Sequence, residues 1–210
     1  MTREFSGWDA TGCDVRWGSE QVTLRVPGIS LEARDNAFRA IQDRIGQGAT
    51  LGEALESVSG DLHAVSVPVG VELSEGVILV DASDISQAAR AVDVVKSVSA
   101  LSRGVRRVVV IAGALDFSSE SDYDNLSAFG ALMVRLNVDQ VFAVGRGARA
   151  LFLSVGMEGS WDGESRFCED SVSAYDDIRA HIKPGDVVLI LGSTDESFTE
   201  MVGKLKADLS

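Results

Sequence analysis

Four short apolar runs alternate with amphipathic stretches of helical period in the second half of this 210-residue chain. The runs occupy residues 76–81, 107–113, 140–145 and 186–192. They are continuous and rich in β-branched residues, which is typical of strands buried on both faces. The sequence therefore predicts an α/β domain with a Rossmann-like, mostly parallel sheet and helices on both faces. In such sheets, ligands bind at the carboxyl ends of the strands, where the strand order reverses.

The first part of the chain follows a different pattern, with a short alternating strand near the N-terminus. An apolar stripe over residues 31–45 predicts one helix, and a capping-box pair, Thr50 and Glu53, predicts the start of another. Residues 60–75 have the valine-rich pattern of a further strand. The predicted domains are a small N-terminal α+β annex, residues 1–75, and the Rossmann-like domain, residues 76–210.

The composition excludes several classes of function. The formal net charge is −13, and no basic stripe is present that could bind nucleic-acid phosphates. No run reaches the roughly 18 apolar residues that span a bilayer, and the N-terminus lacks the apolar core of a signal peptide. Two isolated cysteines make neither a disulfide framework nor a zinc site. We therefore expect a cytoplasmic protein with no nucleic-acid partner and no membrane span.

Polar residues and glycines follow the apolar runs, where a ligand would bind. Asp81 ends the first run, and its carboxylate can accept hydrogen bonds from a ribose, bind a metal ion or cap the next helix. Gly113 follows the second run and allows either close approach of a ligand or a plain turn. Gly192 precedes a predicted helix whose first backbone N–H groups can hold an anion. The neighbouring Ser193 and Thr194 are equally suited to capping that helix.

No complete motif for phosphate binding or nucleophilic catalysis is present. The chain contains neither the G-x-x-x-x-G-K-[ST] loop that cradles ATP nor the G-x-S-x-G nucleophile elbow. Gly145-Arg146-Gly147 lacks the third glycine of the dinucleotide fingerprint. The sequence therefore predicts no catalytic residue, no metal site and no ATP hydrolysis by the chain alone.

The order of these segments resembles the C-terminal domain of the MurF-type Mur ligases, which join D-alanyl-D-alanine to a UDP-muramoyl tripeptide. Residues 81–88 match that family's D-S-Y-N-A-N-P stretch, and residues 111–118 match its L-G-D-M-x-E-L-G stretch. Residues 138–145 match v-D-x-v-x-x-v-G. Residues 183–193 match k-P-G-D-V-V-L-x-K-G-S, except that Leu191 replaces the lysine. Upstream, two stretches resemble the tail of the ligase central domain. They are Val26-Pro27-Gly28 and, in the predicted helix that follows, Asn36-Ala37-Phe38-Arg39-Ala40.

In complete ligases of this family, the domain helps to close over ATP and to hold the incoming dipeptide. By motif position, the resemblance implies six ligand-binding candidates: Asp81, Ser83, Gly113, Asp116, Gly192 and Ser193. ATP and Mg²⁺ would be cofactors of a complete ligase, and none is expected for this chain on its own. The tyrosine and both asparagines of D-S-Y-N-A-N-P are absent, as are the ligase's phosphate loop, metal site and UDP-sugar-binding domain.

Three hypotheses follow from these observations. The chain is either a catalytically incomplete pseudo-ligase of peptidoglycan biosynthesis that acts by binding, or a fragment of an active ligase. A pseudo-ligase would bind a cell-wall biosynthesis protein or a second copy of itself. The third hypothesis is an unrelated small-molecule or protein-binding domain, because one fold carries many functions.

Overall fold

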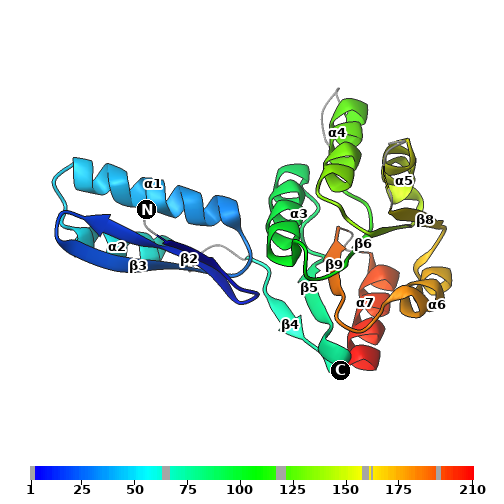
Figure 1. Cartoon of the computed structure of the whole chain (residues 1–210). Coiled ribbons are helices and arrows are strands. Elements are labelled where there is room, and N and C mark those ends of the chain that lie inside the picture. The colour runs from blue at the N-terminus through cyan, green and yellow to red at the C-terminus, as the bar shows by residue number, and fades with distance from the viewer. Residues whose placement is uncertain (1–2, 63–66, 117–121, 158–160, 162, 193–194) are drawn as a thin grey trace. The chain divides into compact units, whose positions relative to one another are not determined.

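The computed structural model describes residues 3–62, 67–116, 122–157, 161, 163–192 and 195–210. The chain forms two compact units, Met1–Gly70 and Val71–Ser210 (Figure 1). The first unit ends at Gly70, whereas the sequence predicts an annex that ends at residue 75. Each unit has its own hydrophobic core.

The first unit is a three-stranded antiparallel sheet with two helices. Its elements are β1 (Arg3–Ser6), β2 (Ala10–Trp17), β3 (Glu20–Pro27), α1 (Leu31–Gly46) and α2 (Leu51–Leu62). Alternate residues of β2 and β3, such as Cys13 and Leu24, are fully buried against helix residues such as Ile41 and Leu51. The expectation of a small α+β annex is therefore confirmed.

Helix α2 begins at the predicted capping box. The Glu53 carboxylate accepts a hydrogen bond from the Thr50 backbone N–H at 2.9 Å, and the Glu53 N–H donates to the Thr50 hydroxyl at 3.3 Å. This reciprocal pair satisfies two backbone donors at the helix start. The helix continues to Leu62, so the predicted strand over residues 60–75 is wrong at its beginning. Among the described residues of that segment, the strand is β4 (Gly70–Glu72), because the helical apolar face of α2 extends further than expected.

The second unit contains a six-stranded sheet in the order β4-β5-β9-β6-β7-β8. Strands β5 to β9 pair in parallel. Their bounds are β5 (Ile78–Ala82), β6 (Val108–Ala112), β7 (Gln140–Val144), β8 (Glu164–Cys168) and β9 (Val187–Leu191). Strands β6, β7 and β9 have five residues each, and all of these residues are buried, as continuous apolar runs predict.

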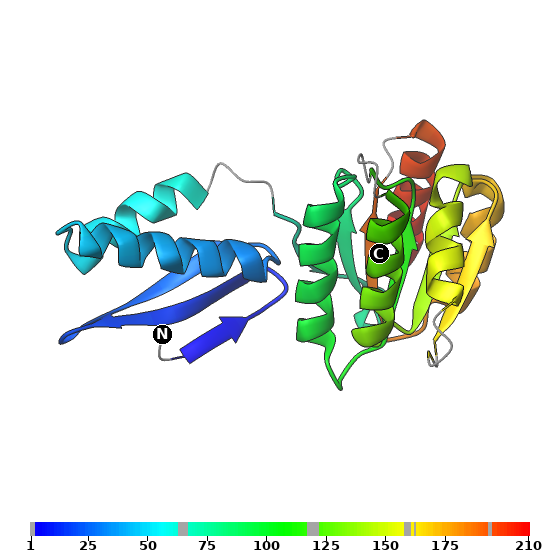
Figure 2. The ribbon, with the colours of Figure 1, turned by 90° about the horizontal axis from the view of Figure 1, so that it is seen from above.

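Helices cover both faces of this sheet (Figure 2). Helices α6 (Ser171–His181) and α7 (Glu196–Leu209) share one core cluster with alternate strand residues such as Ile111 and Ile190. The other helices are α3 (Ala88–Ser102), α4 (Asp122–Arg135) and α5 (Arg149–Gly156), with two single 3₁₀ turns, η1 (Ser74–Gly76) and η2 (Arg146–Ala148). The predicted Rossmann-like fold class is confirmed.

The strand order fixes where this fold can place a site. The chain passes from β5 over to β6 and on to β8, then returns to insert β9 between β5 and β6. The direction of winding therefore reverses beside β9, and this reversal is the usual ligand position in an open parallel sheet. Asp81, Gly113 and Gly192 stand at or just after the ends of these three neighbouring strands.

Neither cysteine forms a disulfide, and both are buried. Burial and the negative charge of Asp177 raise the pKa of the Cys168 thiol, which makes it less reactive. Within the described residues, no helix combines the length and apolar character needed to cross a membrane.

Candidate functional site

The structure brings five of the six candidate residues to the carboxyl edge of the sheet. Asp81 and Ser83 stand at the end of β5, Gly113 and Asp116 follow β6, and Gly192 follows β9. Ser193 lies outside the described residues. The gathering follows from the parallel strands, whose carboxyl ends share one edge.

The Asp81 carboxylate is held by the chain itself. One oxygen accepts a hydrogen bond from the Ser83 backbone N–H at 3.0 Å, and the other forms an ion pair with the Lys206 ammonium of α7 at 2.5 Å. Burial raises the pKa of Asp81, but the bonds from Lys206 and Ser83 outweigh it and leave the pKa below its ordinary value. Asp81 is therefore a charged carboxylate whose partners are already in place.

The two site glycines also use their backbone donors within the protein. The Gly113 N–H donates to the Leu191 carbonyl at 2.9 Å, and the Gly192 N–H donates to the Ile85 carbonyl at 3.1 Å. These two N–H groups are therefore paired within the protein, while the N–H groups of Ser193 and Thr194, at the predicted start of the next helix, lie outside the described residues. Ile85, in the loop after β5, is 1% exposed. An apolar side chain is thus buried where the strand order reverses.

The loops that follow β5 and β6 bind each other across this edge. The Asp116 N–H donates to the Ser86 carbonyl at 2.8 Å, and the Asp116 carbonyl accepts from the Ala88 N–H at 3.3 Å. The Asp116 residue itself is exposed. The Gly192 backbone, at φ +65°, lies so close to Ala114 that a Cβ atom would meet the Ala114 carbonyl oxygen at 2.7 Å.

Two capping expectations are corrected. Helix α3 starts at Ala88 after Gln87, which makes no side-chain capping bond, so neither Asp81 nor its neighbouring serines cap this helix. Asp81 instead closes a tight loop with Ser83, because six residues separate it from the helix. The cap of α7 is Asp195, whose carboxylate accepts from the Ser197 and Phe198 N–H groups. It lies just beyond the expected serine and threonine.

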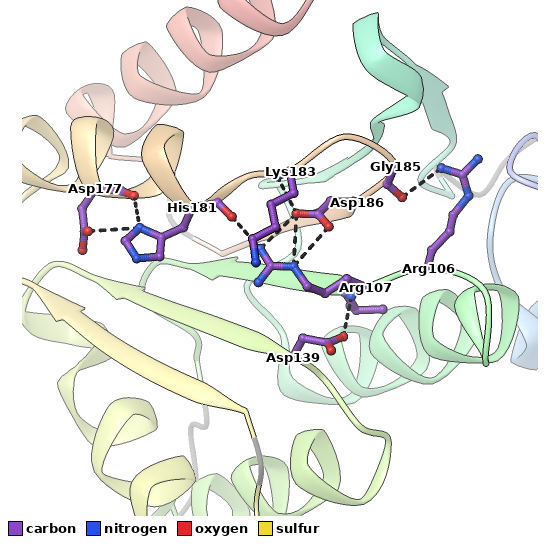
Figure 3. A network of polar contacts seen from close by, with 9 residues as sticks. Arg106, Arg107, Asp139, Asp177, His181, Lys183, Gly185 and Asp186 are labelled. Atoms are coloured by element: carbon purple, nitrogen blue, oxygen red, sulfur yellow. Dashed lines mark hydrogen bonds and ion pairs between the residues drawn. The ribbon is translucent and has the colours of Figure 1, made fainter.

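The opposite, amino edge of the sheet carries a network of charged residues that the sequence analysis did not identify (Figure 3). The Arg107 guanidinium binds the buried Asp186 carboxylate through Nε at 3.1 Å and through a terminal nitrogen at 3.0 Å. It also donates to the His181 carbonyl at the end of α6. The Lys183 backbone N–H donates to the same carboxylate at 2.8 Å. This network ties together the amino ends of β6 and β9 and the end of α6.

The ion pair at Asp81 gives a prediction for pH dependence. Because its pKa is lower in the folded chain, Asp81 stabilises the fold above its unfolded pKa, and this contribution is lost as the pH falls through the folded value. Asp81→Asn is expected to reduce the free energy of unfolding at pH 7 by about 1 kcal/mol, since both partners are partly exposed.

The difference between wild type and Asp81→Asn should shrink between about pH 5 and about pH 3. Urea unfolding at a series of pH values measures it. A difference that stays constant over this interval would contradict the assigned ion pair.

No metal-binding group of three His, Cys, Asp or Glu side chains occurs in the part of the chain that the structure describes.

No family model matches the chain. The UDP-N-acetylmuramoyl-tripeptide–D-alanyl-D-alanine ligase of Mycobacterium leprae (strain TN) is 36% identical over 90 residues, which are 42% of this chain and 17% of that protein.

Two solved ligases share the fold. The MurF ligase of Thermotoga maritima, solved in complex with ADP, has a TM-score of 0.63 at 17% identity and covers all of this chain. MurF of Acinetobacter baumannii has a TM-score of 0.67 at 13% identity over 98% of this chain. The chain spans 47% and 44% of these two ligases. The chain is therefore similar to the MurF ligases, in sequence over part of its length and in fold over a domain-sized segment of those enzymes.

Proposed function

We propose that the chain is a Mur ligase-like protein of peptidoglycan biosynthesis that is catalytically incomplete on its own and acts by binding, as a regulatory pseudo-ligase. The observation that carries this proposal is the occupied carboxyl edge. Asp81 is paired with Lys206, and the Gly113 and Gly192 N–H groups donate within the protein. Among the described residues of this edge, these three groups are thus already paired within the protein and not free to hold a nucleotide.

Phosphoryl transfer requires positioned donors around the phosphates and ligands for Mg²⁺. This chain has no phosphate-loop motif, and Leu191 stands where the family has a lysine. Lys206 does not replace that lysine, because its ammonium neutralises Asp81. ATP and Mg²⁺ are cofactors in this proposal only if the chain works as part of a complete ligase.

The proposed location is the cytoplasm, and the proposed partner is a cell-wall biosynthesis protein or a second copy of the chain.

A turnover assay tests the proposal. The purified chain is incubated with ATP, Mg²⁺, a UDP-muramoyl tripeptide and D-alanyl-D-alanine, and ADP and ligated product are measured. We expect neither to exceed the level without protein, while a complete MurF ligase gives both. Turnover that Asp81→Ala abolishes would overturn the proposal. Turnover that Asp81→Ala leaves unchanged would come from a contaminating ligase.

A fragment of an active ligase is the second candidate, favoured by the 36% identity to the Mycobacterium leprae ligase. If this candidate is right, the chain should restore ligation when it is mixed with, or fused to, that ligase lacking its matching segment. The pseudo-ligase proposal expects no restoration. Restored ligation by the fusion would therefore decide for the fragment.

A further inference from the structure

One edge of the sheet in the second unit is the strand β8, which pairs with β7 and with no other strand among the described residues (Figure 1). Along a parallel strand, alternate residues turn their backbone groups toward the same neighbour. The Glu164 N–H donates to the Asp139 carbonyl at 3.0 Å, and the Cys168 carbonyl accepts from the Gly145 N–H at 2.9 Å. Residues 164, 166 and 168 of β8 therefore bond to β7.

Ser165 and Phe167, which alternate with these residues, turn their backbone N–H and C=O groups to the open side. Within the described part of the chain, neither residue uses these groups in a hydrogen bond. Such an edge offers donors and acceptors to a further strand, and many proteins protect it with lysine or proline. Residues 163–168 contain neither. The charged side chains of β8 therefore decide which strand can add to it.

These charges complement a second copy of β8 in antiparallel orientation. Only outward-facing residues can form the hydrogen-bonded pairs, which limits the registers. With Ser165 opposite its own copy, Glu164 of each chain lies opposite Arg166 of the other, and opposite charges in this position stabilise paired strands. The next register places Arg166 opposite Arg166. The one after it places Glu164 opposite Asp170, so both juxtapose like charges.

The two charged side chains are free to pair across the edge. Glu164 has a side chain that is 64% exposed, and that of Arg166 is 41% exposed. The terminal nitrogens of Arg166 have only long contacts within the chain, 3.6 Å to Glu164 and 3.4 Å to Asp177. A carboxylate from a second copy can therefore approach the Arg166 guanidinium more closely than its present partners do.

The opposite face of β8 carries aromatic rings that such pairing would cover. Phe167 lies 6.0 Å from Phe152 of α5, measured between ring centroids, and both residues are partly exposed. In the charge-complementary register, Phe167 lies opposite Gly163 of the second copy. The ring of Trp161 occupies the place of the missing Gly163 side chain. Aromatic pairs across strands stabilise a sheet, and the small Ser165 on the axis lets the backbones approach.

We propose that β8 is a homodimer interface, at which the β8 strands of two copies pair antiparallel about Ser165 and join their sheets into one. The occupant of the open edge is thus a second copy of this chain, related by a two-fold axis. The interface lies on an edge strand and not at the carboxyl edge of the sheet. Dimer formation and the absence of turnover can therefore each fail without the other.

Sedimentation velocity of the full chain over a range of concentrations measures the association. We expect a reversible equilibrium between monomer and dimer. Glu164→Arg and Arg166→Glu each place like charges opposite each other at both pairs, and each should weaken the dimer at least about tenfold. Glu200→Arg and Arg103→Glu make the same charge changes at exposed positions outside β8 and should change nothing.

A mixture of the two β8 variants tests the register itself. Glu164→Arg chains carry two arginines and Arg166→Glu chains two glutamates at the paired positions. An equal mixture should therefore form a heterodimer at a concentration at which neither variant dimerises alone. Ser165→Pro removes an N–H that faces away from β7, so it should prevent the dimer while circular dichroism shows an intact fold.

Three results would overturn the proposal. The first is a wild-type chain that stays monomeric at millimolar concentration. The second is a dimer that the two charge reversals and Ser165→Pro leave unchanged, since its interface would lie elsewhere. The third is a mixture of folded Glu164→Arg and Arg166→Glu chains that does not associate while the wild type dimerises.

Discussion

Arg107→Met is expected to lower the free energy of unfolding by about 3 kcal/mol, because it leaves the Asp186 carboxylate buried without its cation. Asp186 has a side chain that is 4% exposed, while Arg107 is 24% exposed, so water replaces little of the lost bonding. The methionine keeps most of the apolar stem, and the loss therefore reports mainly on the charge. Urea unfolding followed by circular dichroism measures it.

A second substitution separates the buried charge from lost packing. Asp186→Asn in the Arg107→Met background removes the unpaired charge and keeps an oxygen that can accept from the Lys183 N–H. The double variant should be more stable than Arg107→Met alone, by at least about 1 kcal/mol. A double variant less stable than either single one would show that packing, and not the buried charge, accounts for the loss.

The fold could be predicted because its information is local. Continuous apolar runs such as 107–113 and 186–192 predict strands buried on both faces, and the structure has β6 and β9 within them. The capping box at Thr50 and Glu53 likewise involves residues only three positions apart. The end of α2 was not predicted, because the valine-rich segment after residue 60 also fits a strand.

The position of the site could be predicted, but its contacts could not. The run ends predicted that Asp81, Gly113 and Gly192 meet at one edge, since parallel strands end together. Lys206, the partner of Asp81, is 125 residues further along the chain, and no local pattern links them. Whether Gln140 is solvated or buried depends on how α6 and the neighbouring strand pack over it. Tertiary packing therefore decides which polar groups remain free for a ligand.

Gly192→Ala is expected to lower the free energy of unfolding by about 3 kcal/mol. The backbone at Gly192 has φ +65°, a left-handed conformation that costs an alanine about 1 kcal/mol. The new Cβ would also lie 2.7 Å from the Ala114 carbonyl oxygen and 2.9 Å from a Leu115 methyl. The leucine methyl can move, but the carbonyl belongs to the loop that covers the end of β9. Overpacking of this kind adds roughly 1–3 kcal/mol.

Gly185→Ala is the matched control for this prediction, because Gly185 has φ +81° with open space around the position of a Cβ atom. Gly185→Ala should lower the free energy of unfolding only by the cost of placing an alanine in the left-handed conformation, about 1 kcal/mol. The difference between the two variants in urea unfolding then measures the close approach of the loop after β6 to the end of β9. Equal losses would show that this loop yields easily, and the carboxyl edge would then be able to open for a ligand. A larger loss at Gly192 would mean that rigid backbone contacts between Ala114 and Gly192 hold this part of the edge closed, which would support the proposed lack of turnover.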